Sequence, residues 1–167
     1  MAGMVAMLSS DEHILTISKY GMAKRSKLGT GDRIPDLDAE GKQKTDENGE
    51  GKLTTDGYRI TRSGAKGVRT MKLDESAHDN IISVRTIPDM NDHLFILTKS
   101  GMMIRIRIDQ TKETSGKSTR GTRVMELRDK KNGGFTDEII FSSRVSASLL
   151  DVDDEESSQE TALGEEE

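Results

Sequence analysis

The chain has 167 residues, of which 33% are charged, 32% hydrophobic and 3% aromatic, and it contains no cysteine. This length allows at most one ordinary domain with a thin apolar core. The lack of cysteine excludes disulfide frameworks and thiolate metal sites and fits a reducing cytoplasm. No apolar run approaches the roughly 20 residues that span a bilayer, so no membrane partner is expected.

The net charge of −5 is distributed unevenly along the chain. Residues 151–167 contain nine acidic residues and no basic one, and residues 29–54 have a net charge of −3. Without these two segments the remainder has a net charge of +7. A basic body indicates a polyanionic partner. The acidic tail, 151–167, cannot bury enough apolar surface to order itself, so we expect it to be disordered and to compete with that partner.

Short strands are predicted along most of the chain, and no segment has a helical period. The first of them is rich in β-branched and apolar residues and ends at a glycine turn. In the later run MMIRIRI, three isoleucines face one side and Arg105 and Arg107 face the other. The predicted strands cover residues 14–18, 68–73, 80–87, 94–99, 102–108, 122–127 and 138–145.

The acidic segment 29–54 has glycines scattered among charged residues, which is typical of a long exposed loop or a weak hairpin. Within it, DLDAEGKQKTDE (36–47) approximates the spacing of a calcium-binding EF-hand loop. Glu40 stands at the fifth position, and no helices flank the segment. A solvated acidic loop is therefore the expected structure, with calcium binding as the alternative, and we predict no metal site.

Two internal repeats run through the chain. DEHILTISKYGMAKRSKL (11–28) aligns with NDHLFILTKSGMMIRIRI (91–108) at an offset of 80, and AKGVRTMKL (65–73) aligns with TRGTRVMEL (119–127) at an offset of 54. The difference of 26 is the length of segment 29–54. Four short strands in each repeat are the signature of propeller-like blades.

We therefore expect an all-β fold over residues 1–150, with blade repeats at about 11–90 and 91–146 and an acidic insertion at 29–54. About two four-stranded blades and a partial strand can form. Two blades cannot close a ring, and an open ring leaves bare sheet edges. The expectation is a chain that belongs to a longer protein or that assembles with a partner.

The order of these motifs, followed by an acidic tail, resembles the C-terminal domain of the bacterial DNA gyrase A subunit and the related domain of topoisomerase IV. The resemblance covers most of residues 1–145 outside the insertion. It implies a β-pinwheel, a propeller-like ring of four-stranded blades whose basic rim wraps DNA. MAGMVAM, at the start, resembles the strand before a blade boundary, which implies a domain truncated at its N-terminal side.

The gyrase box of that family, Gln-Arg-Arg-Gly-Gly-Lys-Gly, is required for wrapping. The matching stretch here is TRSGAKG (61–67), in which Arg62, Gly64, Lys66 and Gly67 agree with the box and the other three residues differ. The second repeat has a looser version at 116–121. The box-like loop favours gyrase over topoisomerase IV.

Basic residues of the two repeats, several of which recur in both, form the predicted DNA-contacting set together with two glycines of the box-like loop. Cations on flexible stems suit phosphates, and glycine lets backbone N–H groups approach an anion. With so few aromatic residues, contact with the backbone of duplex DNA is favoured over base stacking on single strands. The set is Arg25, Lys27, Arg62, Gly64, Lys66, Gly67, Arg69, Arg105, Arg107, Lys117, Arg120 and Arg123.

SGKST (115–119) resembles part of a nucleotide-binding loop, but Thr111 occupies the position of the first glycine and a strand follows where that motif needs a helix. No cofactor and no catalytic residue are predicted on this chain. The resemblance implies that a holoenzyme introduces negative supercoils, as a heterotetramer that joins the rest of the gyrase A subunit to the gyrase B subunit and uses ATP and Mg²⁺. It also implies a cytoplasmic, nucleoid-associated location. The alternative function is a protein-interaction propeller that binds an acidic partner.

Overall fold

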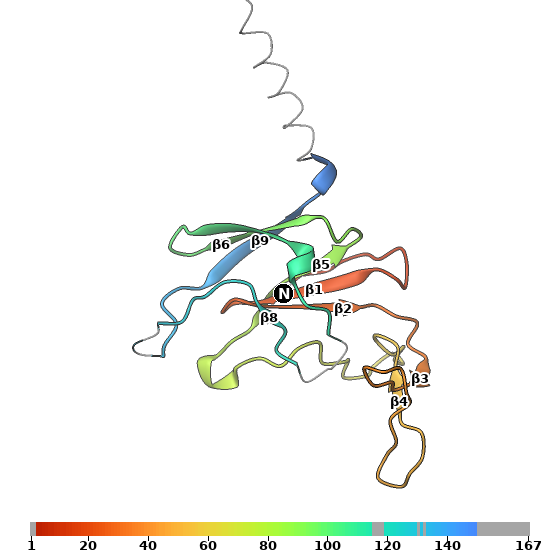
Figure 1. Ribbon diagram of the computed structural model, residues 1–167. Coiled ribbons are helices and arrows are strands. Elements are labelled where there is room, and N and C mark those ends of the chain that lie inside the picture. The colour runs from red at the N-terminus through yellow and green to blue at the C-terminus, as the bar shows by residue number, and fades with distance from the viewer. Residues whose placement is uncertain (1–2, 115–118, 130, 132, 150–167) are drawn as a thin grey trace, which may run out of the picture.

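The computed structural model describes residues 3–114, 119–129, 131 and 133–149 (Figure 1). Lys117 and the acidic tail, 151–167, lie outside the described residues. The elements are β1 (His13–Ser18), β2 (Met22–Lys27), β3 (Arg33–Pro35), β4 (Leu53–Thr55), η1 (Glu75–Ala77), β5 (Ile81–Ile87), β6 (His93–Thr98), β7 (Met103–Arg107), η2 (Ile108–Gln110), β8 (Thr122–Arg123) and β9 (Ile139–Val145). The all-β prediction is confirmed.

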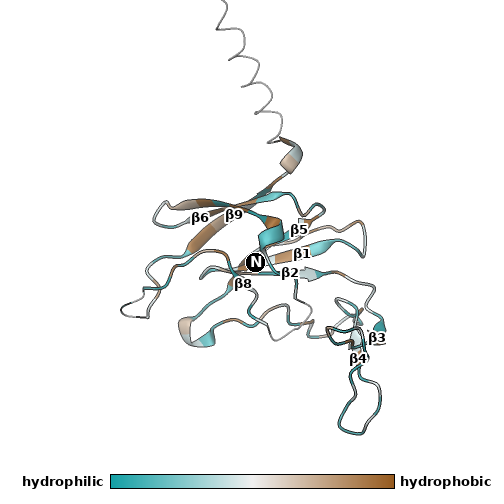
Figure 2. Ribbon diagram, viewed as in Figure 1, coloured by the Kyte–Doolittle hydropathy of each residue, from teal (hydrophilic) through white to brown (hydrophobic). Residues whose placement is uncertain are grey.

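The strands form three antiparallel sheets. The first sheet has the order β5-β1-β2-β8, the second has the order β7-β6-β9, and β3 pairs with β4 in a separate hairpin. One face of the first sheet packs on one face of the second, and the core lies between them (Figures 1 and 2). Leu15, Ile17 and Ala23 reach this core from the first sheet, and Leu94 and Ile96 reach it from the second.

The predicted repeat has a counterpart in strand register. His13 lies opposite Lys27 in the β1–β2 ladder, and His93 lies opposite Arg107 in the β6–β7 ladder. The first strand of each hairpin also pairs with a third strand, β1 with β5 and β6 with β9. In both ladders the register shifts just before the last residue of the first strand, between Ile17 and Ser18 and between Leu97 and Thr98. The offset of 80 therefore relates two hairpins of the same geometry.

Strand β8 joins the first sheet although it lies in the second repeat. Thr122 is opposite Ala23 and Arg123 is opposite Met22. Between β7 and β8, Glu113 forms a parallel bridge with Arg25 of β2. The second repeat thus gives one of its strands to the sheet of the first repeat.

This exchange explains where the strand predictions were wrong. Residues 68–73, the counterpart of 122–127, form no strand, and only two residues of 122–127 form one. A strand is defined by its ladder, and no described strand pairs with 68–73. The second sheet likewise has three strands, not four, among the described residues.

The acidic insertion is a twisted hairpin that projects beside the first sheet (Figure 1). Beyond the β3–β4 ladder, further bridges join Leu37 to Gln43 and Thr45 to Gly51. Asp38 and Asp46 each accept two backbone N–H bonds within their own turn. No group of three metal-ligating side chains gathers anywhere in the described part of the chain, so the calcium alternative gains no support.

Acidic side chains hold the turns of both hairpins. Asp137 accepts the backbone N–H of Ser100 at 3.2 Å, and Asp79 accepts that of Tyr20 at 3.3 Å. Glu138 joins the hairpins, because it pairs with Lys19 of the first at 2.5 Å and with Lys99 of the second at 3.3 Å. Across the described residues, no helix is long and apolar enough to cross a membrane.

Candidate nucleic-acid interface

The box-like loop is the most open basic segment of the described chain. Every residue from 59 to 67 is exposed. The Ala65 N–H donates to the Arg62 carbonyl at 3.2 Å, which closes a tight turn, and Gly64 within it has φ +82°. Neither Arg62 nor Lys66 forms an ion pair with a described residue. Two unneutralised cations therefore flank a glycine turn at the tip of the loop.

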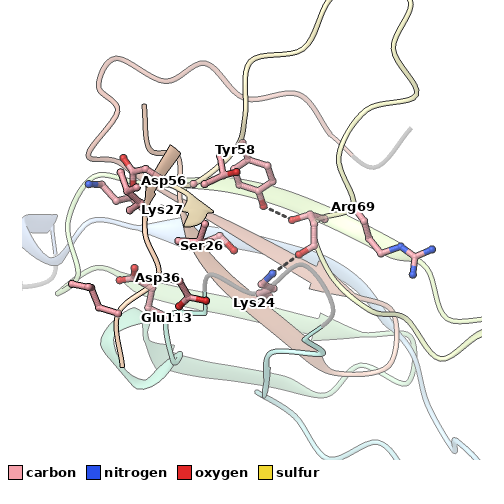
Figure 3. Close-up of a pocket in the computed structure, with 14 residues that line it drawn as sticks. Lys24, Ser26, Lys27, Asp36, Asp56, Tyr58, Arg69 and Glu113 are labelled. Carbon is pink, nitrogen blue, oxygen red and sulfur yellow. Dashed lines mark hydrogen bonds between the residues drawn. The ribbon is translucent and has the colours of Figure 1, made fainter. Parts of the chain in front are cut away.

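Both ends of this loop are anchored to the body of the protein. The Tyr58 N–H donates to the Leu28 carbonyl at 2.8 Å. The Tyr58 hydroxyl lies 2.5 Å from Oγ1 of Thr70, and Nζ of Lys24 donates to the Thr70 carbonyl at 2.5 Å (Figure 3). These contacts border a cavity of about 230 Å³, from which Arg69 points away (Figure 3). Fixed ends and a free tip present the cations without burying them.

Lys24 is an unusual member of this anchor. Its side chain is buried, with 2% exposure, and burial lowers the pKa of its ammonium group. The second repeat has Ile104 at the same position. The Lys24 amine thus serves the carbonyl of Thr70 inside the structure and is not available to a surface ligand.

A second basic group lies where the two repeats meet. Arg69 from the first repeat and Arg120 from the second line one hollow of about 580 Å³, together with Lys72. Arg120 also lines a neighbouring hollow that Arg123 and Arg128 share. The sequence-predicted cations Arg69, Arg120 and Arg123 are therefore neighbours in space.

Acidic groups partly neutralise this second group. Arg128 pairs with Asp74 at 3.7 Å, and Arg123 pairs with Glu126. A hydrogen bond from Ser76, aided by the charges of Arg120 and Arg128, lowers the pKa of the Asp74 carboxyl. The electrostatic potential around this group is therefore less positive than the number of arginines alone would give.

Arg25 and Arg105 are repeat counterparts that the fold treats differently. Arg25 is half-buried between the sheets, where its guanidinium donates to the Thr111 carbonyl at 3.0 Å and contacts the Met90 sulfur at 2.5 Å. Arg105 is exposed, donates to Nδ1 of His93 at 2.5 Å and lies 5.9 Å from the Phe95 ring centre. The structure assigns Arg25 to packing and leaves Arg105 open.

The remaining predicted residues are dispersed. Lys27 pairs with Asp11 at 3.3 Å, and exposed Arg107 pairs with Asp109. Lys27 lies in β2 and lines the cavity at the anchored end of the box-like loop. Arg107 lies in β7 and lines none of the cavities described here. The eleven predicted residues that the structure describes thus divide among a loop, a hollow and two hairpins, and Lys117 lies outside the described residues.

Sequence reasoning missed Lys72 and Arg128. The predicted set came from basic positions that recur in both repeats and from the box-like loop with its looser copy. Lys72 meets neither condition, because it aligns with Glu126 in the second repeat. The alternation of basic residues in VRTMKL was the available signal for Lys72. For Arg128, which follows the second repeat motif, no pattern indicated its position beside Asp74.

Comparison with known proteins adds to this geometry. Residues 52–88 and 92–133 match the family model described as the DNA gyrase C-terminal domain, beta-propeller. These two segments, just under half of the chain, are similar to that family. The suspected resemblance is therefore confirmed, and the matched residues include the box-like loop and β8.

Relatives of known name agree with this family. The chain is 41% identical over 85 residues to the DNA gyrase A subunit of Helicobacter pylori strain J99, which covers 50% of this chain and 10% of that protein. It is 26% identical over 160 residues to the DNA gyrase A subunit of Rickettsia bellii, which covers 96% of this chain and 14% of that protein. The chain thus spans only about a tenth to a seventh of the length of these relatives.

A solved structure supports the fold. The C-terminal domain of DNA topoisomerase IV superposes with a TM-score of 0.52 at 17% identity, over 85% of this chain and 33% of that one. At this identity the likeness concerns the fold alone. It agrees with paired antiparallel sheets in a propeller-like arrangement.

Proposed function

We propose that the chain is a duplex-DNA-binding and wrapping module of a type IIA topoisomerase, within the A subunit of DNA gyrase. The observation that carries this proposal is the box-like loop, with Arg62 and Lys66 exposed and without ion pairs to described residues on either side of the Gly64 turn. The match to the family model and the basic charge of the body support it. Such cations neutralise phosphates without reading sequence and release counterions as they bind.

Wrapping needs several contacts, because bending a site of 20–30 base pairs costs on the order of 1–6 kcal/mol. The loop supplies two cations, and the hollow lined by Arg69, Lys72 and Arg120 supplies more. In the proposed holoenzyme, the wrapped segment is presented to the rest of the gyrase A subunit and to the gyrase B subunit. ATP and Mg²⁺ act there, and a cytoplasmic, nucleoid-associated location follows from this role.

The test is a salt titration of the 167-residue chain with a short random-sequence duplex. The logarithm of the association constant should fall linearly with the logarithm of salt concentration, with a slope of about −0.9 for each phosphate contact. Arg62→Ala with Lys66→Ala should make the slope shallower by about 1.8, since two contacts are lost. A slope near zero for the unaltered chain would remove the proposal and favour an acidic protein partner.

The matched control removes the same charge elsewhere. Arg33→Ala with Lys42→Ala takes two exposed cations from the insertion hairpin. This variant should keep the slope of the unaltered chain within about 0.4, which is half of one contact. Ligation of nicked DNA circles in the presence of the chain then separates wrapping from binding, because only wrapping changes the linking number of the closed product.

A further inference from the structure

The acidic insertion leaves the body of the protein and returns to it through one narrow neck. The Tyr58 N–H donates to the Leu28 carbonyl at 2.8 Å, across the whole insertion. A methyl group built on Gly57 would overlap that same carbonyl oxygen, so the two sides of the neck touch through their backbones. Residues 30–56, beyond the neck, form the acidic arm (Figure 1).

The neck has the geometry of a two-residue turn. Gly29 and Gly57 have φ +69° and +62°, and a type I′ turn needs a positive φ at both of its central residues. The bond from Tyr58 to Leu28 is the bond that would close this turn. In the second repeat residues 109–111, with the end of η2, make the same connection. The sheet therefore does not need the arm to close, which indicates another role for it.

The arm is a branched structure that is closed on itself. Backbone N–H groups of Asp36, Lys44 and Lys52 donate in a ring to the carbonyls of Lys52, Asp36 and Lys44, at 2.9, 2.8 and 2.7 Å. The Asp36 carboxylate pairs with both lysines, at 2.8 Å and 3.7 Å. Two turns extend from this ring, and Asp38 and Asp46 each accept two N–H bonds within one of them. The arm therefore holds its charges at fixed positions.

The arm and the segment that follows it have opposite charges. Residues 30–56 contain eight acidic and four basic residues, a net charge of −4. Residues 57–73, which include the box-like loop, contain five basic residues and no acidic one. Among the acids of the arm, only Asp36 forms an ion pair with a described residue. Most of the negative charge of the arm is therefore directed to the solvent.

The base of the arm lies against the start of the box-like loop. A methyl group built on Gly31 would lie 3.0 Å from the Tyr58 carbonyl oxygen and from the Ile60 nitrogen. Asp32, the next residue, is exposed. Beyond the loop, Arg69 lines both the cavity that the arm borders and the basic hollow of about 580 Å³. The loop thus stands between an acidic arm and a surface with several cations.

We propose that the acidic arm repels the duplex on one side of the box-like loop and so directs it toward the basic hollow. The inference rests on the proposed binding of duplex DNA and adds the side on which the duplex leaves the loop. Phosphates near the arm meet fixed carboxylates, whereas phosphates on the other side meet Arg69, Lys72 and Arg120. Such repulsion acts over roughly 10 Å at 0.1 M salt and over longer distances in more dilute salt.

The first experiment changes the charge of the arm and keeps its shape. Glu40→Gln with Glu47→Gln and Glu50→Gln removes three negative charges from exposed positions. The association constant for a short random-sequence duplex should rise about fivefold at about 0.05 M salt and less than about twofold at about 0.5 M, because salt screens the repulsion. Ala39→Glu with Asn48→Asp adds two charges to the same surface and should lower the constant about threefold in the dilute salt. A change of shape would move both variants in the same direction.

Deletion of residues 30–56 tests the arm as a whole. The deletion joins Gly29 to Gly57 in a turn whose closing bond is already present, so the shortened chain should unfold cooperatively. It should bind the duplex more tightly than the glutamine variant in dilute salt, and the two should converge as salt is added. If the shortened chain does not fold, the glutamine variant decides alone.

Energy transfer shows which side the duplex takes. The chain has no cysteine, so Asn48→Cys on one turn of the arm and Glu75→Cys at the basic hollow each carry one donor dye. Transfer to acceptor dyes spaced along the duplex should be strong from position 75 and weak from position 48. In the glutamine variant the transfer from position 48 should increase.

The outcomes separate this inference from the proposed function. A steep salt slope of the unaltered chain, together with unchanged affinity in the glutamine variant or equal transfer from the two dyes, overturns the role of the arm and leaves DNA binding in place. A slope near zero for the unaltered chain overturns both.

Discussion

The hairpins β1–β2 and β6–β7 have the same ladder but different surroundings. In the first hairpin one face is covered by the second sheet and the β2 edge is covered by β8. In the second hairpin the corresponding face and edge are open in the described structure. Equal local sequence patterns thus give one hairpin that is core and another that is surface. Paired substitutions at equivalent positions measure this difference directly.

The largest contrast is expected at Ile17 and Leu97, which are repeat counterparts. Ile17→Ala should lower the free energy of unfolding by about 2–5 kcal/mol, because a fully buried side chain leaves a cavity. Leu97→Ala should cost less than half as much in dilute solution, since this side chain is only half-buried. Urea unfolding measures both values. Equal costs would mean that the side chain of Leu97 is packed as tightly as that of Ile17.

The next contrast concerns Arg25 and Arg105. Arg25→Ala should lower the free energy of unfolding by about 1–3 kcal/mol, because the Thr111 carbonyl loses its donor between the sheets. Arg105→Ala should stay within about 0.5 kcal/mol, as exposed substitutions do. Its effect should instead appear as weaker duplex binding. If Arg25→Ala weakened DNA binding at unchanged stability, the assignment of Arg25 to packing would be wrong.

A smaller, pH-dependent effect is expected at the turn of the second hairpin. Hydrogen bonds from Ser100 and then Thr98 lower the pKa of the Asp137 carboxyl from 3.8 to about 2. A lowered folded-state pKa stabilises the protein above the unfolded value, and this stability is lost as pH falls from about 4 to about 2. Asp137→Asn should flatten the melting temperature over this window. The first hairpin offers a control in Asp79→Asn, and an identical flattening there would show that the effect is not local to Asp137.

The smallest contrast is between Lys24 and Ile104. Burial lowers the pKa of Lys24 below 10.5, so the unfolded chain binds this proton more tightly and stability rises as pH approaches 10.5. Lys24→Met removes the amine and should remove this rise, at the cost of the bond to Thr70. Thermal unfolding between neutral and alkaline pH compares the two proteins. Parallel curves would place the ammonium group in contact with water.

The sequence predicted what depends on neighbouring residues. Alternation and glycine turns located β1, β6, β7 and the long strands β5 and β9. β2 was not among the predicted strands, although its segment aligned with that of β7 in the repeat. The sequence also predicted a strand at 68–73, where the structure has none. A local residue pattern does not show whether a neighbouring strand is available for pairing. The exchange of β8 between repeats was invisible for the same reason.

The candidate site shows the same limit. The box-like loop was predicted residue by residue, since its glycines and cations are local features. Arg25 and Arg105 look alike in sequence, and only packing separates them. Lys72 and Arg128 join the basic hollow through the fold, beside Asp74 and Arg120, with little sequence signal.

The donated strand β8 also determines when the first sheet can be completed during synthesis. The ribosome synthesises β1 and β2 before β8. The first sheet cannot be completed until β8 is made, after the whole β6–β7 hairpin. Until then the edge of β2 is bare, and pairing distant segments slows folding and exposes the nascent chain to aggregation. A chaperone that shields the newly made first hairpin until residue 123 has emerged should therefore raise the yield of folded protein more than one that acts on the finished chain.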